Sequence, residues 1–158
     1  MTAPRWLSEE EDKLWRLILM ATRKVEHHID NVLQDGHNLT TSEFAVLVSL
    51  SDSPDKEVRL RDLSAALDWD RSRTSHQVTR MEKRGLVTKQ KCAGDARGII
   101  IELTEEGERR LREAAPSHVE SVREIVFDSL DSSLVGPVAQ FMQNIMDQPV
   151  ESNRDRKR

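Results

Sequence analysis

The sequence has little of what secreted and membrane proteins depend on. It contains one cysteine in 158 residues, so no disulfide can form within the chain. No apolar run approaches the length of a membrane span, and the N-terminal segment MTAPRWLSEEED has no apolar signal-peptide core. Hydrophobic residues make up 37% and charged residues 33%, which suits a helical protein that completes its burial in an oligomer. We therefore expect a cytoplasmic protein.

The motifs of common enzyme classes are also absent. The chain has no glycine-rich phosphate loop, no G-x-S-x-G sequence and no pair of carboxylates placed as catalytic groups. His27, His28, Asp30 and His37 lie close in sequence, but adjacent histidines on a helix point about 100° apart and do not converge on a metal. We expect neither an enzyme, a metal site nor a cofactor.

The most unusual stretch is a basic island at residues 71–91. It holds seven lysines and arginines against one acidic residue, Glu82, although the whole chain has a net charge of −4. An island of one sign in a chain of the other is typical of a polyanion site, whereas solvated surfaces usually mix their signs. The island opens in a predicted helix, for which Asp70 is a good N-cap and Gly85 a good C-terminal stop.

The two faces of this basic helix differ in character. Thr74, Val78, Met81 and Gly85 share one face, which we expect to pack inward. The opposite face carries the hydroxyl, amide and cationic groups that can read base edges in a DNA major groove. These residues are Ser72, Arg73, His76, Gln77, Arg80 and Lys83. An ordinary solvated helix face is the alternative, against which the basic island argues.

Turn signals place this helix in a helix-turn-helix followed by a wing. A short helix is predicted from Arg61 to about Asp68, and only residues 68–70 separate it from the basic helix. Beyond Gly85, β-type runs at 86–91 and 99–103 bracket a polar loop at 92–98, which predicts a β-hairpin. Residues 58–60 can form only a small edge strand. The predicted fold class is mainly α with a small β-hairpin wing, a winged helix-turn-helix.

The N-terminal part of the chain predicts two further helices. Ser8 with Glu11, and Thr40 with Glu43, both match the capping-box pattern. The first helix is predicted to reach about Gln34, before the sequence DGHN at 35–38 breaks it. A helix of more than about 25 residues in a small chain indicates that it has a partner.

The C-terminal part predicts helices that need a second chain. Thr104 caps a helix whose apolar stripe continues to about Leu130, and Pro116 either kinks or breaks it. A last amphipathic helix covers 134–146. The winged unit is too small to bury these stripes, so a two-fold dimer is expected. We therefore predict one interleaved domain with a dimerisation helix at 8–36, a DNA-binding region at 40–104, dimerisation helices at 105–147 and a disordered tail at 148–158.

An ordered series of motifs runs through the predicted winged unit. D-x-S-x-T starts at residue 70, M-E-x-x-G-L-V at 81, D-x-R at 95, and L-T occupies 103–104. With this series the chain resembles, from Ser8 to Met146, the MarR family of bacterial winged-helix regulators. The resemblance implies that the basic helix enters the major groove and that Asp95 orients Arg97 into the minor groove, where negative potential concentrates. It also implies a regulator, here expected to be a repressor, that a small aromatic or anionic ligand releases from DNA.

A dimer of this kind specifies its DNA partner. Two recognition helices about one helical turn apart require an inverted-repeat operator in double-stranded DNA. Base or groove contacts are predicted for Arg73, His76, Gln77 and Arg80, and phosphate contacts for Ser72, Ser75, Lys89 and Lys91. The alternative is a helical interaction protein whose basic face binds an acidic partner.

Two residues are candidates for receiving a signal. Trp15, on the first helix, either lines a ligand pocket or packs at the dimer interface. Cys92 lies at the base of the wing near Lys89, Lys91 and Arg97, and cationic neighbours favour the oxidisable thiolate. Oxidation of Cys92 is thus an alternative way to release DNA; otherwise Cys92 is an inert residue that ends a strand.

Overall fold

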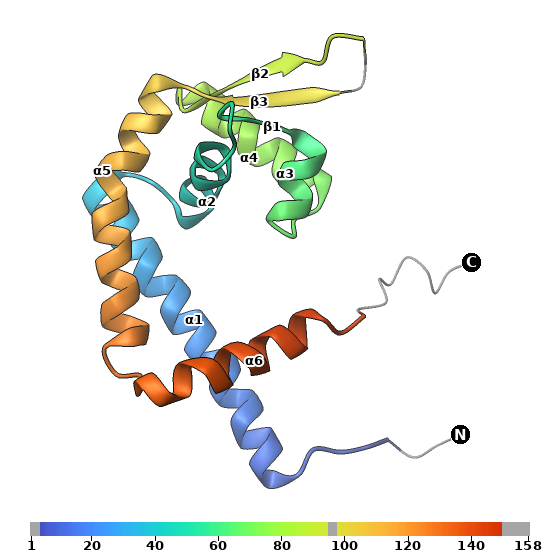
Figure 1. Ribbon diagram of the computed structural model, residues 1–158, viewed down its shortest axis with the longest axis vertical. Coiled ribbons are helices and arrows are strands. Elements are labelled where there is room, and N and C mark those ends of the chain that lie inside the picture. The colour runs from blue at the N-terminus through green and yellow to red at the C-terminus, as the bar shows by residue number, and fades with distance from the viewer. Residues whose placement is uncertain (1–3, 95–97, 150–158) are drawn as a thin grey trace. The chain divides into compact units, whose positions relative to one another are not determined.

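The structure is a computed structural model that describes residues 4–94 and 98–149 (Figure 1). It divides into two units after Val122. The first unit contains α1 (Glu9–His37), α2 (Thr41–Ser51), β1 (Glu57–Arg59), α3 (Leu60–Ala66), α4 (Arg71–Lys83), β2 (Val87–Lys91), β3 (Ile99–Leu103) and α5 (Glu105–Val122). The strands pair antiparallel in the order β1-β3-β2, with Val58 of β1 and Lys89 of β2 both opposite Ile101. The predicted fold class, mainly helical with a winged helix-turn-helix, is confirmed.

Local capping chemistry sets where the first two helices begin. The Ser8 hydroxyl accepts from the Glu11 amide (3.2 Å), and the Glu11 carboxylate accepts from the Ser8 amide (2.8 Å). Thr40 and Glu43 repeat this exchange at the start of α2, at 3.1 and 3.0 Å. Both predicted capping boxes are confirmed, because each needs only residues three positions apart.

The predicted end of the first helix was wrong. Instead of breaking at residues 35–38, α1 continues through Gly36 to His37 and ends at Asn38, which adopts a left-handed conformation with φ of 50°. The Asn38 amide donates to the Gln34 carbonyl (2.9 Å). Side chains from other elements bind the last carbonyls, so α1 ends where tertiary partners satisfy them.

Two other predicted boundaries shift. The helix predicted from Arg61 to about Asp68 runs from Leu60 to Ala66, and Asp68 has a φ of 51° in the following turn. Pro116 lies inside an unbroken α5, so of the two predicted alternatives, a kink or a break, the break does not occur. After Val122 the backbone forms a π-helical turn at Arg123–Phe127 rather than continuing as α-helix to Leu130.

The hydrophobic core of the first unit lies where α2, α3, α4 and the sheet meet. Leu47, Leu63, Val78 and Ile101, one from each of these elements, are fully buried. The last turns of α1 reach this core through Leu33, which is buried too. Helix α4 is therefore held from behind by a closed apolar cluster.

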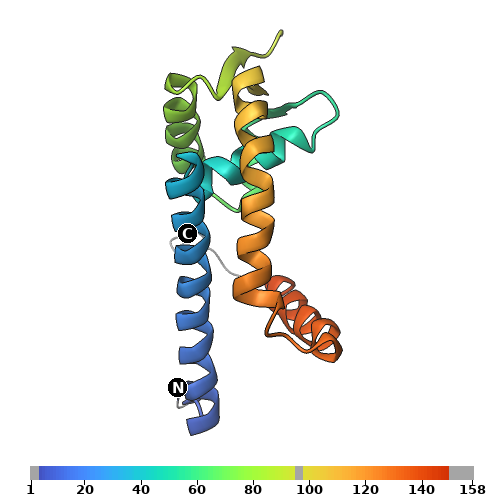
Figure 2. The same cartoon turned by 90° about the vertical axis from the view of Figure 1, so that its left-hand side faces the viewer.

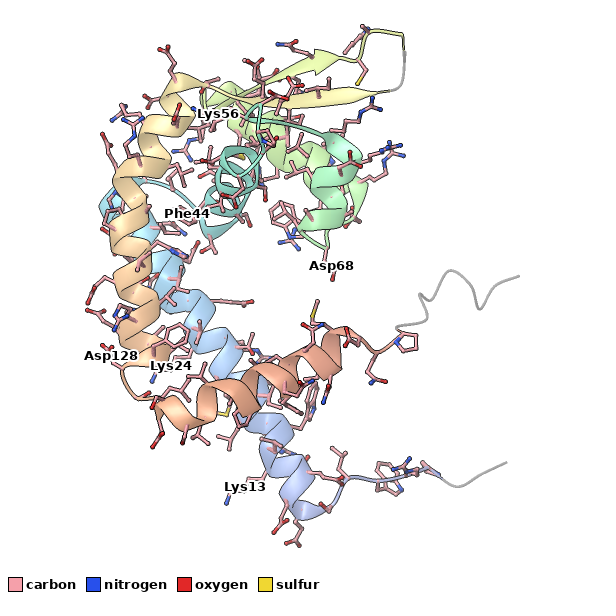
Figure 3. The ribbon with its side chains drawn as sticks, in the orientation of Figure 1. Lys13, Lys24, Phe44, Lys56, Asp68 and Asp128 are labelled. Carbon is pink, nitrogen blue, oxygen red and sulfur yellow. The ribbon has the colours of Figure 1, made fainter. Side chains whose placement is uncertain are left out.

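Helix α5 packs along α1, as Figure 2 shows, and also covers α2. Phe44 of α2, labelled in Figure 3, stacks on His118 of α5 with ring centroids 4.4 Å apart. Burial lowers the pKa of His118 below its usual value, which favours the neutral form of the ring that stacks on the phenyl group. Lys56, also labelled, extends to Glu108 of α5 (2.7 Å).

The start of α5 makes a close backbone approach. A Cβ atom at Gly107 would lie 2.1 Å from the carbonyl oxygen of Leu86 and 2.9 Å from Cδ1 of Leu103. Thr104 caps the helix as predicted, because its hydroxyl accepts from the Gly107 amide (3.0 Å). The first turn of α5 thus rests directly on the segment that follows α4.

The second unit is small and keeps apolar side chains exposed. It contains the π-helical turn, a short 3-10 turn at Ser132–Leu134 (η2) and α6 (Val135–Met146). The exposed apolar residues of α6 include Val138, Phe141, Met142 and Ile145. Across the described parts of both units, no helix has the length and apolar character needed to cross a membrane. The predicted disordered tail lies, from residue 150 onward, outside the described residues.

The two glycines of α1 and α5 lead to opposite expectations. Gly107→Ala should lower the free energy of unfolding by about 1–3 kcal/mol, because the methyl group must displace the Leu86 carbonyl. Gly36→Ala, where a Cβ meets nothing within 4 Å, should raise it by about 0.5–1 kcal/mol. Denaturant titration of both variants measures these shifts. Equal stabilities would contradict the close approach at Gly107.

Candidate nucleic-acid interface

Helix α4 is fixed at both ends by hydrogen bonds between side chains and the backbone and within the backbone. At its start, the Asp70 carboxylate accepts from the Arg73 amide (2.8 Å), as the sequence predicts for an N-cap. At its end, Gly85 takes a φ of 73° and the Leu86 amide donates to the Met81 carbonyl (3.0 Å). The Thr104 hydroxyl then donates to the Gly85 carbonyl (2.7 Å), so the capping residue between β3 and α5 also holds this end.

Buried hydroxyl groups join α3 to α4 within the helix-turn-helix. The Thr74 hydroxyl donates to the Asp70 carbonyl (3.0 Å). The Ser64 hydroxyl in turn donates to the Thr74 hydroxyl oxygen (2.9 Å). Both side chains are buried, so the bond between them forms out of contact with solvent. The Trp69 amide donates to the Ser64 carbonyl (2.9 Å), which closes the turn. The angle between the two helices is therefore set by hydrogen bonds as well as by packing.

Most of the α4 residues predicted to contact DNA are exposed on one side of the helix. These are Ser72, Arg73, Ser75, His76 and Arg80. The guanidinium of Arg73 lies over the Trp69 ring, 4.4 Å from its centroid, so a cation–π contact limits the directions this side chain can take. The exposed side of α4 is thus a partly preorganised cationic surface.

Gln77 is the exception, and its predicted place on the exposed face was wrong. Its side chain is only 5% exposed and accepts a hydrogen bond from the Arg80 guanidinium. Positions 74, 77, 78 and 81 form the i, i+3, i+4, i+7 stripe of a helix, so Gln77 lies on the inward side of this stripe. The periodicity of the sequence therefore indicated that Gln77 is buried. The polarity of its side chain led instead to the prediction of an exposed position.

The wing residues divide into exposed, paired and undescribed groups. Lys91 is exposed at the end of β2, and its phosphate contact stays a prediction, but the Lys89 ammonium lies 3.0 Å from the Glu82 carboxylate. Cys92 is 8% exposed, and its amide donates to the Gly98 carbonyl (2.9 Å). Burial of this thiol favours a structural role for Cys92 over an oxidant sensor. The motif at residues 95–97 lies outside the described residues, so its predicted minor-groove contact stays a prediction.

An open pocket of about 520 Å³ lies beside the start of α4. Arg23, His27 and Asp30 of α1 line it together with Trp69 and Arg73. Burial opposes ionisation of Asp30, but hydrogen bonds from the amide and hydroxyl of Thr41 hold the pKa of Asp30 below its usual value. The pocket therefore combines an aromatic face with groups of both charges.

Trp15 does not line this pocket. It is 50% exposed on α1, near the exposed apolar residues Leu14, Leu17 and Met20. The aromatic residue of the pocket is instead Trp69, which lies in the turn between α3 and α4. No three potential metal ligands gather anywhere in the described residues.

A cluster of charges connects the far end of α4 to α1 and α2. The Arg84 guanidinium donates to both carboxylate oxygens of Glu43 (2.6 Å each) and to the Asn38 carbonyl (2.6 Å). Arg110 of α5 donates to the His37 carbonyl (2.7 Å) and to the same Asn38 carbonyl (3.0 Å). The Glu43 side chain is 5% exposed, so its charge depends on Arg84 for compensation.

Comparison with known proteins identifies relatives of this chain. A family model described as MarR family matches residues 37–98. The chain is similar to a crystal structure of Sco3205, a MarR family transcriptional regulator from Streptomyces coelicolor, in complex with DNA: 37% identity, TM-score 0.89, and coverage of 95% of this chain and 96% of that chain.

Two curated relatives from Escherichia coli also match. The transcriptional regulator HosA of strain E2348/69 is 30% identical over 113 residues, 72% of this chain and 76% of the relative. The transcriptional repressor MprA of strain K12 is 27% identical over 115 residues, 69% of this chain. This chain spans 65% of the length of MprA.

Loss of the Arg84 side chain should destabilise the protein through Glu43. Arg84→Met leaves a buried carboxylate without its cation, and we expect a loss of about 2–4 kcal/mol in the free energy of unfolding. Arg61→Met is the matched control, because Arg61 forms an exposed pair with Asp62 (3.1 Å) and should change stability by less than about 0.5 kcal/mol. Equal losses of unfolding free energy in a denaturant titration would show that the Glu43–Arg84 pair stabilises the protein no more than an exposed ion pair.

Proposed function

This chain belongs to the MarR family of transcriptional regulators, and we propose that it is a dimeric repressor. The proposed dimer binds an inverted-repeat operator, and a small aromatic ligand releases it from the DNA. The main support for DNA binding is the exposed cationic side of α4. This helix is held within a winged helix-turn-helix by its N-cap and by buried hydroxyl groups. The relative Sco3205, 37% identical, was crystallised in complex with DNA. Family membership also argues for a regulator rather than an enzyme.

The proposed contacts follow from what each exposed side chain offers. Arg73, His76 and Arg80 supply donors for base edges, whereas Ser72 and Ser75, in the first turns of α4, are suited to phosphate oxygens. Gln77 acts behind this surface, because its hydrogen bond with Arg80 orients the guanidinium. Asp95 and Arg97 remain candidates for the minor groove. A regulator acts where the chromosome lies, so we propose a cytoplasmic site of action.

Dimerisation is supported by apolar side chains that each unit leaves exposed. On α1 of the first unit these are Leu14, Trp15, Leu17 and Met20, and in the second unit they lie on α6. Exposed apolar surface on this scale is typical of an interaction surface. A second copy related by a two-fold axis covers it, and the same axis gives the operator its inverted symmetry.

The pocket beside α4 supports the choice of an aromatic, anionic effector. Trp69 provides a flat apolar surface, and the Arg73 and Arg23 guanidinium groups can bind a carboxylate or phenolate. Because Arg73 also belongs to the proposed DNA surface, a ligand that holds this side chain competes with DNA for it. Release then requires no large rearrangement of α4.

The DNA-binding proposal predicts a salt-dependent and residue-specific interaction. The protein should bind an inverted repeat in its own upstream region as one dimer per site, with an affinity that falls steeply as salt rises. Arg80→Ala should weaken operator binding by about 5-fold to 150-fold. Arg109→Ala is the control, because Arg109 is paired with Glu106 and Glu113 on α5 and should leave affinity nearly unchanged.

Quantitative mobility-shift titrations, with the same sites selected from random DNA, measure these affinities. Equal effects of Arg80→Ala and Arg109→Ala would contradict the assignment of α4 as the DNA surface. Binding of an acidic protein partner without any DNA binding at low salt would favour the alternative of a helical interaction protein.

The effector proposal separates Trp69 from Trp15. A panel of aromatic carboxylates and phenols, beginning with benzoate, should include members that weaken operator binding by the wild-type protein. Trp69→Ala should abolish this response by removing the aromatic wall, whereas Trp15→Ala, outside the pocket, should keep it. Operator titrations at increasing ligand concentration provide the measurement. A response lost only in Trp15→Ala would move the ligand site to α1, and no response to any compound would contradict an aromatic effector.

A further inference from the structure

The one acidic residue of the basic island, Glu82, has both carboxylate oxygens directed at a single residue of the wing. Its Oε2 lies 3.0 Å from the Lys89 ammonium, and its Oε1 accepts from the Lys89 backbone amide (3.3 Å). The same ammonium donates to the Thr79 hydroxyl (3.2 Å). The Thr79 hydroxyl donates its own proton to the Ser75 carbonyl (2.8 Å), so its lone pairs are free to accept.

The position of Lys89 on the sheet explains why its amide is available. The Cys92 amide donates to Gly98 of the opposite strand, and donors alternate along an antiparallel strand, so the amides of even-numbered β2 residues face β3. The Lys89 amide therefore points to the open edge, because β2 is the outer strand of the order β1-β3-β2. Glu82 of α4 binds this edge.

We propose that Lys89 is a positioning residue that joins the wing to the recognition helix, rather than a phosphate contact as the sequence alone predicts. The proposal rests on the DNA-binding function proposed above. Glu82 neutralises the charge of Lys89, and Glu82 and Thr79 together occupy two of the three donors of the ammonium. The contact lies two residues before the last residue of β2, Lys91, and fixes the strand that leads into the wing loop.

The joint matters because DNA recognition by a winged unit uses two grooves at once. The exposed side of α4 is the surface proposed for the major groove, and β2 leads into residues 92–94, the described start of the wing loop (Figure 1). Without a contact at its outer edge, β2 would allow the wing a range of orientations relative to α4, and the entropy of these orientations would be lost on DNA binding. The contacts of the Lys89 amide and ammonium with the Glu82 carboxylate restrict these orientations.

The first test needs no DNA. In amide hydrogen exchange of the full-length protein followed by NMR, Glu82→Ala should speed exchange of the Lys89 amide by about fivefold. The Gln90 amide, which faces β3, should be unchanged and serves as the internal control. An unaltered rate at Lys89 would overturn the proposal.

The second test separates a positioning residue from a phosphate contact. When log affinity for the operator is plotted against log salt, Lys89→Met should leave the slope of the wild-type protein unchanged while weakening binding about twofold to fivefold. Lys91→Met, the loss of an exposed lysine from the same strand, should reduce the slope by about one unit. A loss of about one unit for Lys89→Met would overturn the proposal. If the wild-type protein binds no DNA, the proposed function fails, and the exchange experiment still decides the role of Glu82.

Discussion

The contact on which the rest of the first unit depends is the ion pair between Glu43 and Arg84. Glu43 serves two purposes, because its carboxylate caps the start of α2 and also binds the arginine that directly follows α4. Leaving a carboxylate this buried without its cation is strongly destabilising, so the start of α2 and the end of α4 stabilise each other. The recognition helix is thereby fixed to the helices behind it through one residue at its C-terminal cap.

The same cluster explains why α1 ends where it does. Helix C-termini leave carbonyl groups without intrahelical partners, and in α1 the carbonyls of His37 and Asn38 accept from Arg84 and Arg110. Because Arg84 directly follows α4 and Arg110 lies in α5, the end of α1 is bonded to residues of two other helical segments. A displacement of α1 would therefore reach α4 through Arg84, which is a physical route between the helix that lines the pocket and the proposed DNA surface.

The parts of the fold that depend on near neighbours in sequence were predictable, and those that depend on distant residues were not. The capping box at Ser8 and the N-cap at Asp70 follow from bonds over three residues. The partner of Arg84 lies 41 positions away, and no pattern of spacing indicates it. The pocket was missed for the same reason, since Trp69 meets α1 only through the tertiary fold. Gln77 is different, because the helical stripe indicated its burial and side-chain polarity was given too much weight.

Pairing between residues distant in sequence also changes how many cations of the basic island are available to a polyanion. The sequence offers seven cations to a polyanion, but Arg84 is committed to Glu43 and Lys89 to Glu82. Within the described part of the chain, the others have no carboxylate partner: Arg71, Arg73, Arg80, Lys83 and Lys91. Counterion release counts only cations that reach phosphate, so the island is electrostatically weaker than its composition implies. Two of its cations instead hold α4 and β2 in place, and the remaining charge acts from a rigid surface.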